Sequence, residues 1–225
     1  MCLSVPTPPG IRMSVSETVI LVHGLLTPGA ELWLLAQRLR RRGFETIIFR
    51  YPTRRRDLHH NAAGLARLAR SRKGAAVHCV GHSLGGLVIL EALRQNGLPR
   101  GRVVLLGSPV QGSCVAQRLS NYGPGCWLLG KSTEDCLLQA APDWDYNRDI
   151  GIIAGTRPIG IGPVLGGLQG EHDGVVSVAE TGLAGATDRI VVPVTHVGLV
   201  FSRPVARQVC EFLQHGHFIP VIQVR

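Results

Sequence analysis

Residues 75–96 read AAVHCVGHSLGGLVILEALRQN, a strand pattern followed by a sharp turn and a helix pattern. The apolar start favours a buried strand, and leucines at helical spacing near the end favour a helix. Between the two lies Gly-His-Ser-Leu-Gly, a Gly-x-Ser-x-Gly sequence centred on Ser83. Gly81 and Gly85 lack the Cβ atoms that would clash in such a turn. The stretch therefore predicts a serine held at a strained strand-to-helix junction.

This placement makes Ser83 a candidate nucleophile. The helix that follows directs its amino end toward the serine, so its free N–H groups favour a negative charge that develops there. The alternative is an ordinary serine in a glycine-rich turn, because the chain contains 28 glycines. The strand before the turn and the helix after it favour the nucleophile, since the motif is informative only in that context.

Length and composition predict one α/β domain. A chain of 225 residues suits a single domain with a sizeable core, and its strand and helix patterns alternate. The formal net charge is +9 and is carried almost entirely by arginine, since Lys73 and Lys131 are the only lysines. Aromatic residues make up 5% and do not interleave with a basic helix, so nucleic-acid binding is not expected. The charge allows weak attraction to anionic membrane surfaces.

The amino-terminal residues differ from the remainder of the chain. Residues 1–16 contain Pro6, Pro8 and Pro9 and lack a continuous apolar segment. We expect a disordered leader there rather than a signal peptide, followed by one domain over residues 17–225. No apolar run approaches the length that spans a membrane, so the expected location is the cytoplasm.

The order of predicted elements places the remaining features. Besides the strand before Ser83, strands are expected at residues 18–22, 44–49, 103–106, 149–154 and 189–194. Helices are expected at residues 29–42, 57–72 and about 204–213, besides the helix after Ser83. Residues 112–148 interrupt this alternation with glycines, prolines and an apolar patch. We interpret them as a short cap-like insertion over the catalytic edge, with a peripheral packing segment as the alternative.

The first predicted strand runs directly into His23-Gly24-Leu25-Leu26. Gly24 allows the backbone to turn, so that the N–H of Leu25 can face a substrate carbonyl oxygen. The N–H of Leu84, directly after the candidate nucleophile, would be the second donor of this oxyanion hole. We expect His23 to brace the loop by hydrogen bonds rather than to act as a base.

A serine hydroxyl needs a base, and the base needs an acid that fixes its tautomer. His196 fits the base because it follows the last predicted strand, at the edge of the sheet where ligands bind. Asp173 fits the acid because it lies on the loop after the penultimate strand and precedes a glycine. Glu171 is the alternative acid. The Glu171-His172-Asp173 sequence has little to support a metal site, so no metal or other cofactor is expected.

The chain resembles the small bacterial α/β-hydrolases of the lipase and esterase type. The matching elements are Val22-His23-Gly24-Leu25, Gly81-His82-Ser83-Leu84-Gly85-Gly86, Gly107-Ser108-Pro109, Asp173-Gly174-Val175-Val176 and Thr195-His196. The resemblance implies a mostly parallel central sheet with helices on both faces. It also implies hydrolysis of a small-molecule ester or lipid through an acyl-enzyme, with Ser83, Asp173 and His196 as the triad. It differs from larger lipases in having a short insertion in place of an extensive lid.

The binding pocket and the reaction type are the remaining expectations. We expect Leu26, Val110, Trp127 and Val197, beside Leu25, to shape an apolar pocket for the acyl group. An acyltransferase or a thioesterase would use the same acyl-enzyme, and no residue distinguishes them. A non-enzymatic binding protein on the same scaffold is the alternative from another class, and an intact triad argues against it. The sequence leaves the oligomeric state open.

Overall fold

The computed structural model describes residues 17–25, 27–74, 76–121 and 148–220. Six strands form a single sheet in the order β2-β1-β3-β4-β5-β6, and every neighbouring pair is parallel. The strands are β1 (Thr18–Val22), β2 (Glu45–Phe49), β3 (Val77–His82), β4 (Val103–Leu106), β5 (Ile150–Gly155) and β6 (Asp188–Val192). The predicted α/β fold is confirmed, with a sheet that is wholly parallel in the described residues.

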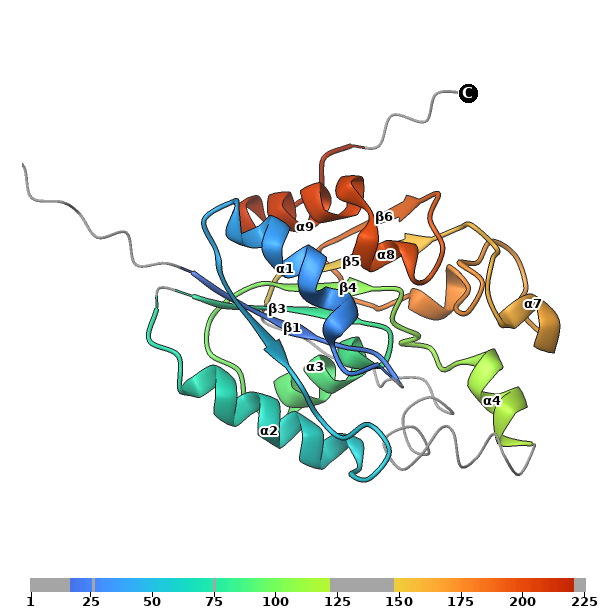
Figure 1. The fold of residues 1–225 in the computed structure, drawn as a ribbon, viewed down its shortest axis with the longest axis horizontal. Coiled ribbons are helices and arrows are strands. Elements are labelled where there is room, and N and C mark those ends of the chain that lie inside the picture. Colours follow the sequence, from blue (N-terminus) through green and yellow to red (C-terminus); the bar gives the residue numbers. More distant parts are fainter. Residues whose placement is uncertain (1–16, 26, 75, 122–147, 221–225) are drawn as a thin grey trace, which may run out of the picture.

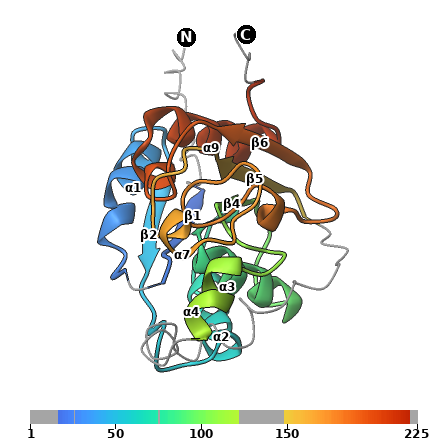
Figure 2. The ribbon, with the colours of Figure 1, turned by 90° about the vertical axis from the view of Figure 1, so that its right-hand side faces the viewer.

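Helices cover both faces of this sheet (Figure 1). One face carries α1 (Trp33–Arg40), α8 (Gly198–Phe201) and α9 (Arg203–His215), and the other carries α2 (Leu58–Arg70) and α3 (Leu84–Arg94). The short helices α4 (Cys114–Ser120) and α7 (Gly162–Leu165) lie beyond the carboxyl ends of the strands, in front in Figure 2. Two single 3-10 turns, Ala30–Leu32 and Ala179–Thr181, complete the described helical elements.

Two apolar layers, one on each face, hold the helices to the sheet. Strand β1 supplies both layers, because successive side chains of a strand point to opposite faces. Its Val19 and Leu21 pack with α1 and α9, while its Ile20 and Val22 pack with α2 and α3. All four side chains are fully buried. Burial on both faces explains why this strand reads as a continuous apolar run rather than an alternating one.

Capping explains where the helices differ from the sequence prediction. Helix α2 was expected from residue 57, but Asp57 is its cap, and the Asp57 carboxylate accepts a hydrogen bond from the N–H of His60 at 2.7 Å. Helix α1 was expected from residue 29, but Gly29 has a φ of 85° and residues 30–32 form a 3-10 turn. Neither difference moves the strands that carry the candidate site.

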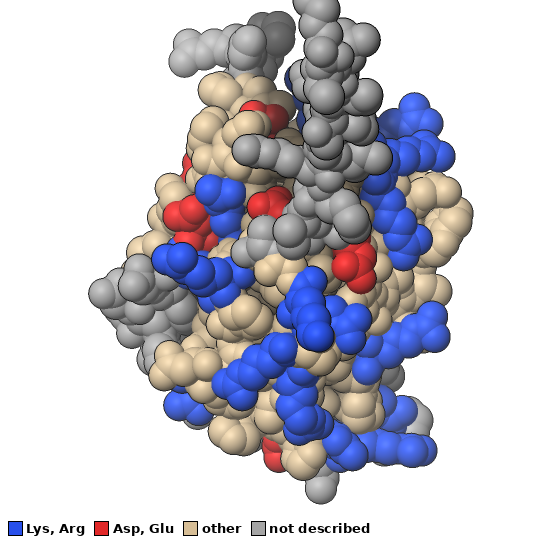
Figure 3. Space-filling model, turned by 90° about the vertical axis from the view of Figure 1, so that its left-hand side faces the viewer, with Lys and Arg blue, Asp and Glu red and all other residues tan. Residues whose placement is uncertain are grey.

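The amino edge of the sheet, opposite the candidate site, carries much of the positive charge (Figure 3). Helices α1 and α2 end there, and their last turns and following residues include the exposed Arg40, Arg41, Arg42, Arg70 and Lys73. Basic side chains at helix carboxyl ends interact favourably with the helix dipole, so this charge has a structural explanation. Weak attraction of the chain to anionic membrane surfaces remains a prediction.

Several sequence expectations concern residues outside the described ranges. The expected leader over residues 1–16 lies there, as do Leu26 and most of the expected cap at residues 112–148. The described part of that insertion contains α4, which was not expected as a helix. No helix among the described residues combines the length and the apolar character that crossing a membrane requires.

Candidate active site

Ser83 occupies a strained turn between β3 and α3. Its backbone has φ 54° and ψ −124°, a conformation that residues other than glycine rarely adopt. The turn is possible because its neighbours are glycines. A Cβ on Gly81 would lie 2.6 Å from the backbone of Gly86, and one on Gly85 would lie 2.2 Å from the carbonyl oxygen of Val22. The geometry matches the sharp junction that the sequence predicts.

Asp173 and His196 form a hydrogen-bonded pair at the same edge of the sheet. Nδ1 of His196 lies 2.7 Å from Oδ2 of Asp173, and both side chains are buried. The other carboxylate oxygen, Oδ1, accepts hydrogen bonds from the N–H groups of Val175 and Val176 at 3.0 and 2.8 Å. Because the carboxylate can only accept, His196 donates from Nδ1, and its Nε2 remains as the basic nitrogen.

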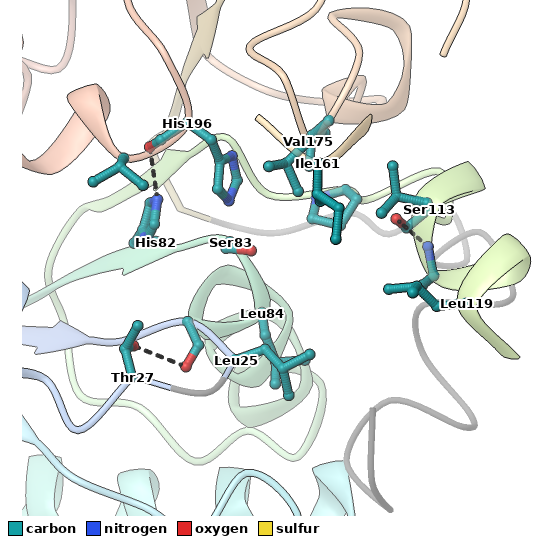
Figure 4. Close-up of a pocket in the computed structure, with 16 residues that line it drawn as sticks. Leu25, Thr27, His82, Ser83, Leu84, Ser113, Leu119, Ile161, Val175 and His196 are labelled. Carbon is teal, nitrogen blue, oxygen red and sulfur yellow. Dashed lines mark hydrogen bonds between the residues drawn. The ribbon is translucent and has the colours of Figure 1, made fainter. Parts of the chain in front are cut away.

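Ser83 and His196 open onto one cavity of about 270 Å³, and Figure 4 shows the His196 ring directed toward Ser83. The polar side chains of its lining are Thr27, His82, Ser83, Ser113 and His196. The rest of the lining is apolar and is formed by Gly24, Leu25, Leu84, Pro109, Val115, Ala116, Leu119, Ile161, Val175, Val176 and Val197. Such a lining suits an uncharged, apolar group held next to the serine.

The loop after β1 is braced by His23. Nδ1 of His23 is 2.9 Å from the carbonyl oxygen of Gly24, and Nε2 accepts from the N–H of Tyr51 at 3.3 Å. The Tyr51 hydroxyl donates to the carbonyl oxygen of His23 at 2.8 Å, and the two rings stack with centroids 4.4 Å apart. Burial lowers the pKa of His23 below its ordinary value, which favours the neutral ring that these bonds require. His23 therefore has the bracing contacts expected from the sequence.

The predicted pocket residues have different positions. Leu25 and Val197 line the cavity, and Val197 is 57% exposed; Leu84, predicted as an oxyanion-hole donor, lines it too. Val110 does not line the cavity: its fully buried side chain packs in the layer beneath α2 and α3, and Pro109 contacts the cavity instead. Leu26 and Trp127 lie outside the described residues.

Helix α4 supplies cavity residues that the sequence reasoning missed. Val115, Ala116 and Leu119 line the cavity, and Figure 4 shows Leu119 across the cavity from Ser83. A signal for this helix was present, because Ser113 can act as a cap and Val115 and Leu119 are four residues apart. In the structure Oγ of Ser113 accepts from the N–H of Ala116 at 3.2 Å.

The described residues contain no group of three His, Cys, Asp or Glu side chains arranged to hold a metal ion. Ser83, His82 and His196 are in the cavity lining, and the buried Asp173 carboxylate contacts His196 outside that lining. Burial, together with a smaller effect of nearby His196, lowers the pKa of His82 to about 3. His82 is consequently neutral at ordinary pH.

The fold, the turn at Ser83 and the Asp173–His196 pair define an α/β hydrolase. The chain belongs to the alpha/beta hydrolase family, whose model matches residues 19–218. No curated protein sequence matches the chain. The family assignment confirms the resemblance noted in the sequence at the level of the family and the fold.

Solved structures share this fold at low sequence identity. The mature lipase BlEst2 of Bacillus licheniformis matches with a TM-score of 0.68 at 21% identity, over 97% of this chain and 96% of that one. The metagenomic carboxyl esterase MGS0156 matches with a TM-score of 0.64 at 18% identity, over 85% of this chain and 68% of that one. The type II thioesterase BorB from the borrelidin biosynthetic cluster matches with a TM-score of 0.64 at 16% identity, over 88% of this chain and 92% of that one.

Proposed function

We propose that this chain is a serine hydrolase that cleaves carboxylic esters of small molecules or lipids through an acyl-enzyme. The supporting observation is the 2.7 Å contact between His196 and Asp173 beside the strained turn at Ser83, at one end of an apolar cavity. A nucleophile, a base and an acid in this relation are what acyl transfer from an ester requires.

In the proposed reaction Nε2 of His196 accepts the proton of Ser83, and the serine oxygen attacks the ester carbonyl carbon. The carbonyl oxygen becomes an oxyanion that accepts hydrogen bonds from the backbone N–H groups of Leu25 and Leu84. Each donor contributes about 3 kcal/mol of transition-state stabilisation. His196 then gives its proton to the leaving alcohol, and the acyl group remains on Ser83. Water, deprotonated by His196, releases the acid by the same steps in reverse.

The cavity lining argues for an uncharged acyl group. Its described side chains are mostly aliphatic, and none carries a formal charge when His82 and His196 are neutral. An anionic acyl group would lose its hydration there without gaining an ion pair. We therefore propose aliphatic esters, rather than esters of dicarboxylic acids, as the substrate class.

A thioesterase is the second candidate. The same attack releases a thiol in place of an alcohol, and the structural neighbours include the type II thioesterases BorB and YbtT. Two substrates with the same acyl group separate an esterase from a thioesterase: p-nitrophenyl hexanoate and S-hexanoyl-N-acetylcysteamine. The larger kcat/KM identifies the preferred leaving group. An acyltransferase would form an ester product when an alcohol is added, and a binding protein would turn over neither substrate.

The test of the proposed function is the initial rate on p-nitrophenyl esters of increasing acyl length. We expect wild type to hydrolyse them and Ser83→Ala to lose a factor of about 1000 or more. Ser108→Ala is the matched control, because Ser108 is a buried serine that follows the neighbouring strand and does not line the cavity. Equal activity in wild type and Ser83→Ala, or no activity on any ester or thioester, contradicts the proposal.

A further inference from the structure

His82 is a buried histidine beside the candidate site that the proposed reaction does not use. It is the last residue of β3, directly before Ser83, and is 5% exposed. Its Nε2 lies 3.0 Å from the backbone carbonyl oxygen of His196, a residue 114 positions away in the chain (Figure 4). A carbonyl oxygen can only accept, so the proton of the neutral His82 ring is on Nε2.

This hydrogen bond joins two parts of the site that are otherwise connected to different neighbours. His196 is held to the acid loop, because its N–H donates to the carbonyl oxygen of Asp173 at 2.9 Å and its ring contacts the Asp173 carboxylate. Ser83 is held to β4 through its N–H, which donates to the carbonyl oxygen of Leu106 at 2.9 Å. Among the described residues, the hydrogen bond of His82 is the one that directly connects β3 to the loop of His196.

The chemistry of the His82 ring suits a fixed, neutral link. Its centroid is 4.7 Å from that of His196, so a charge on it would oppose the imidazolium that forms on His196 during the reaction. Its Nδ1 has no hydrogen-bond partner in the described part of the chain. Burying the unpartnered Nδ1 has a cost that an apolar side chain of the same size would avoid. The hydrogen bond from Nε2 is therefore the interaction that a histidine makes here and an apolar side chain cannot.

We propose that His82 is a positioning residue, which sets the distance between the base and the nucleophile by holding the backbone of His196 to the end of β3, directly before Ser83. The inference rests on the proposed function, since it assigns His196 as the base. A displacement of about 1 Å in such a pair can reduce the rate by about 100-fold.

The experiment compares two substitutions at His82 in the full chain. The amide nitrogen of Gln reaches the position of Nε2, so His82→Gln retains the donor, while His82→Met has similar length and no donor. His78→Met is the matched control, because His78 is also buried in β3 but its Nδ1 accepts from the N–H of Arg102, away from the site. The measurements are kcat and KM on the best p-nitrophenyl ester, the melting temperature, and the low-field proton resonance of His196 Nδ1–H.

We expect His82→Met to lower kcat by about 10- to 100-fold with KM within about twofold of wild type. His82→Gln should restore kcat to within about threefold of wild type, and His78→Met should lower the melting temperature without lowering kcat. The low-field resonance should persist in His82→Gln and broaden or shift in His82→Met. That resonance needs no substrate, so it reports on positioning even if the proposed ester chemistry fails.

Three results would overturn the inference. One is a wild-type kcat for folded His82→Met. Another is a loss of kcat in folded His82→Gln as large as in His82→Met, which would show that the donor is not what matters. The third applies if His82→Met does not fold: a kcat reduced by more than about tenfold in folded His82→Gln then contradicts the positioning role.

Discussion

Asp173 illustrates how a single carboxylate serves both folding and the candidate chemistry. It is 1% exposed, and its two oxygens accept three hydrogen bonds, two from backbone N–H groups of its own loop and one from His196. The first two bonds fix the carboxylate, and the third fixes the tautomer of His196. Glu171, the alternative acid in the sequence, is exposed and lies two residues away.

Replacing Asp173 tests this division of roles. Asp173→Asn should lower kcat by about 1000- to 10,000-fold. If the amide oxygen accepts from the backbone N–H groups, the amide NH₂ faces Nδ1 of His196 and forces the ring into the wrong tautomer. If the amide is flipped, its NH₂ group opposes the backbone N–H groups. Glu171→Gln is the control and should retain activity within about twofold. The measurement is kcat on a p-nitrophenyl ester at pH 8. A greater loss in Glu171→Gln than in Asp173→Asn would transfer the role of acid to Glu171.

Helix α4 illustrates how an element distant in sequence from Ser83, Asp173 and His196 can shape the cavity. Its start is fixed by two caps: Ser113 accepts from Ala116, and Oε1 of buried Glu180 accepts from the N–H of Cys114 at 2.6 Å. The other oxygen of Glu180 accepts from the N–H of Ser177 at 2.6 Å. Glu180 thereby connects α4 to the segment that begins at Asp173.

Because α4 faces Ser83 across the cavity, its side chains should limit the length of the acyl chain. Leu119→Ala removes about three carbons from that wall, so the preferred ester should lengthen by about two to three methylenes, each worth about 0.8 kcal/mol when buried. Ala116→Leu should shift the preference toward shorter esters. The measurement is kcat/KM across p-nitrophenyl acetate to laurate.

Gln117→Ala is the control on the same helix, since the exposed Gln117 does not line the cavity. Its chain-length profile should match that of wild type. Identical profiles for wild type, Leu119→Ala and Ala116→Leu would show that α4 does not contact the acyl group. That result would leave the proposed catalytic residues unaffected, because the Ser83→Ala comparison tests them separately.

At the scale of the molecule, the candidate site and much of the basic surface lie at opposite edges of the parallel sheet. Parallel strands all end at one edge, which collects the loops carrying Leu25, Ser83, Asp173 and His196. The helices end at the opposite edge, where arginine side chains complement their dipoles. The same packing buries His23, His78 and His82, and burial lowers the pKa of each.

Because these histidines have lowered pKa values, we expect acid to reduce the free energy of unfolding. Their folded pKa values lie below the ordinary value of 6.5, with His82 at about 3, so below pH 6.5 the unfolded chain binds more protons than the folded one. Their contribution to stability is complete above pH 6.5 and decreases as the pH falls toward 3. Each buried histidine that stays neutral contributes a slope of up to about 1.4 kcal/mol per pH unit.

The measurement is the free energy of unfolding by urea at pH 7.5, 6.0 and 5.0. Wild type should lose stability steadily across this range. His82→Gln removes one titrating group from the folded and unfolded states. Its free energy of unfolding should therefore fall less steeply below pH 6.5, by up to about 1.4 kcal/mol per pH unit. A wild-type stability that is constant from pH 7.5 to 5.0 would contradict the prediction, as would identical slopes in the two proteins.

The sequence by itself determined the α/β class, the six strands to within about two residues, and the turn at Ser83. These features depend on short-range physics: apolar runs bury themselves, and only glycine fits where an added Cβ would lie 2.6 Å (Gly81) or 2.2 Å (Gly85) from neighbouring backbone atoms. Asp173 and His196 were also predicted from their places after strands, because parallel strands end together.

The tertiary structure alone decided the contacts between segments distant in the chain. In the folded chain Val110 packs in the core, while Pro109 lines the cavity. Helix α4 lies across the cavity from Ser83. It also brought the ring of His82 to the backbone of His196, across 114 residues. No local pattern encodes these distances, since they depend on how whole elements pack against the sheet. Periodicity identifies which faces are buried, whereas packing determines which side chains meet.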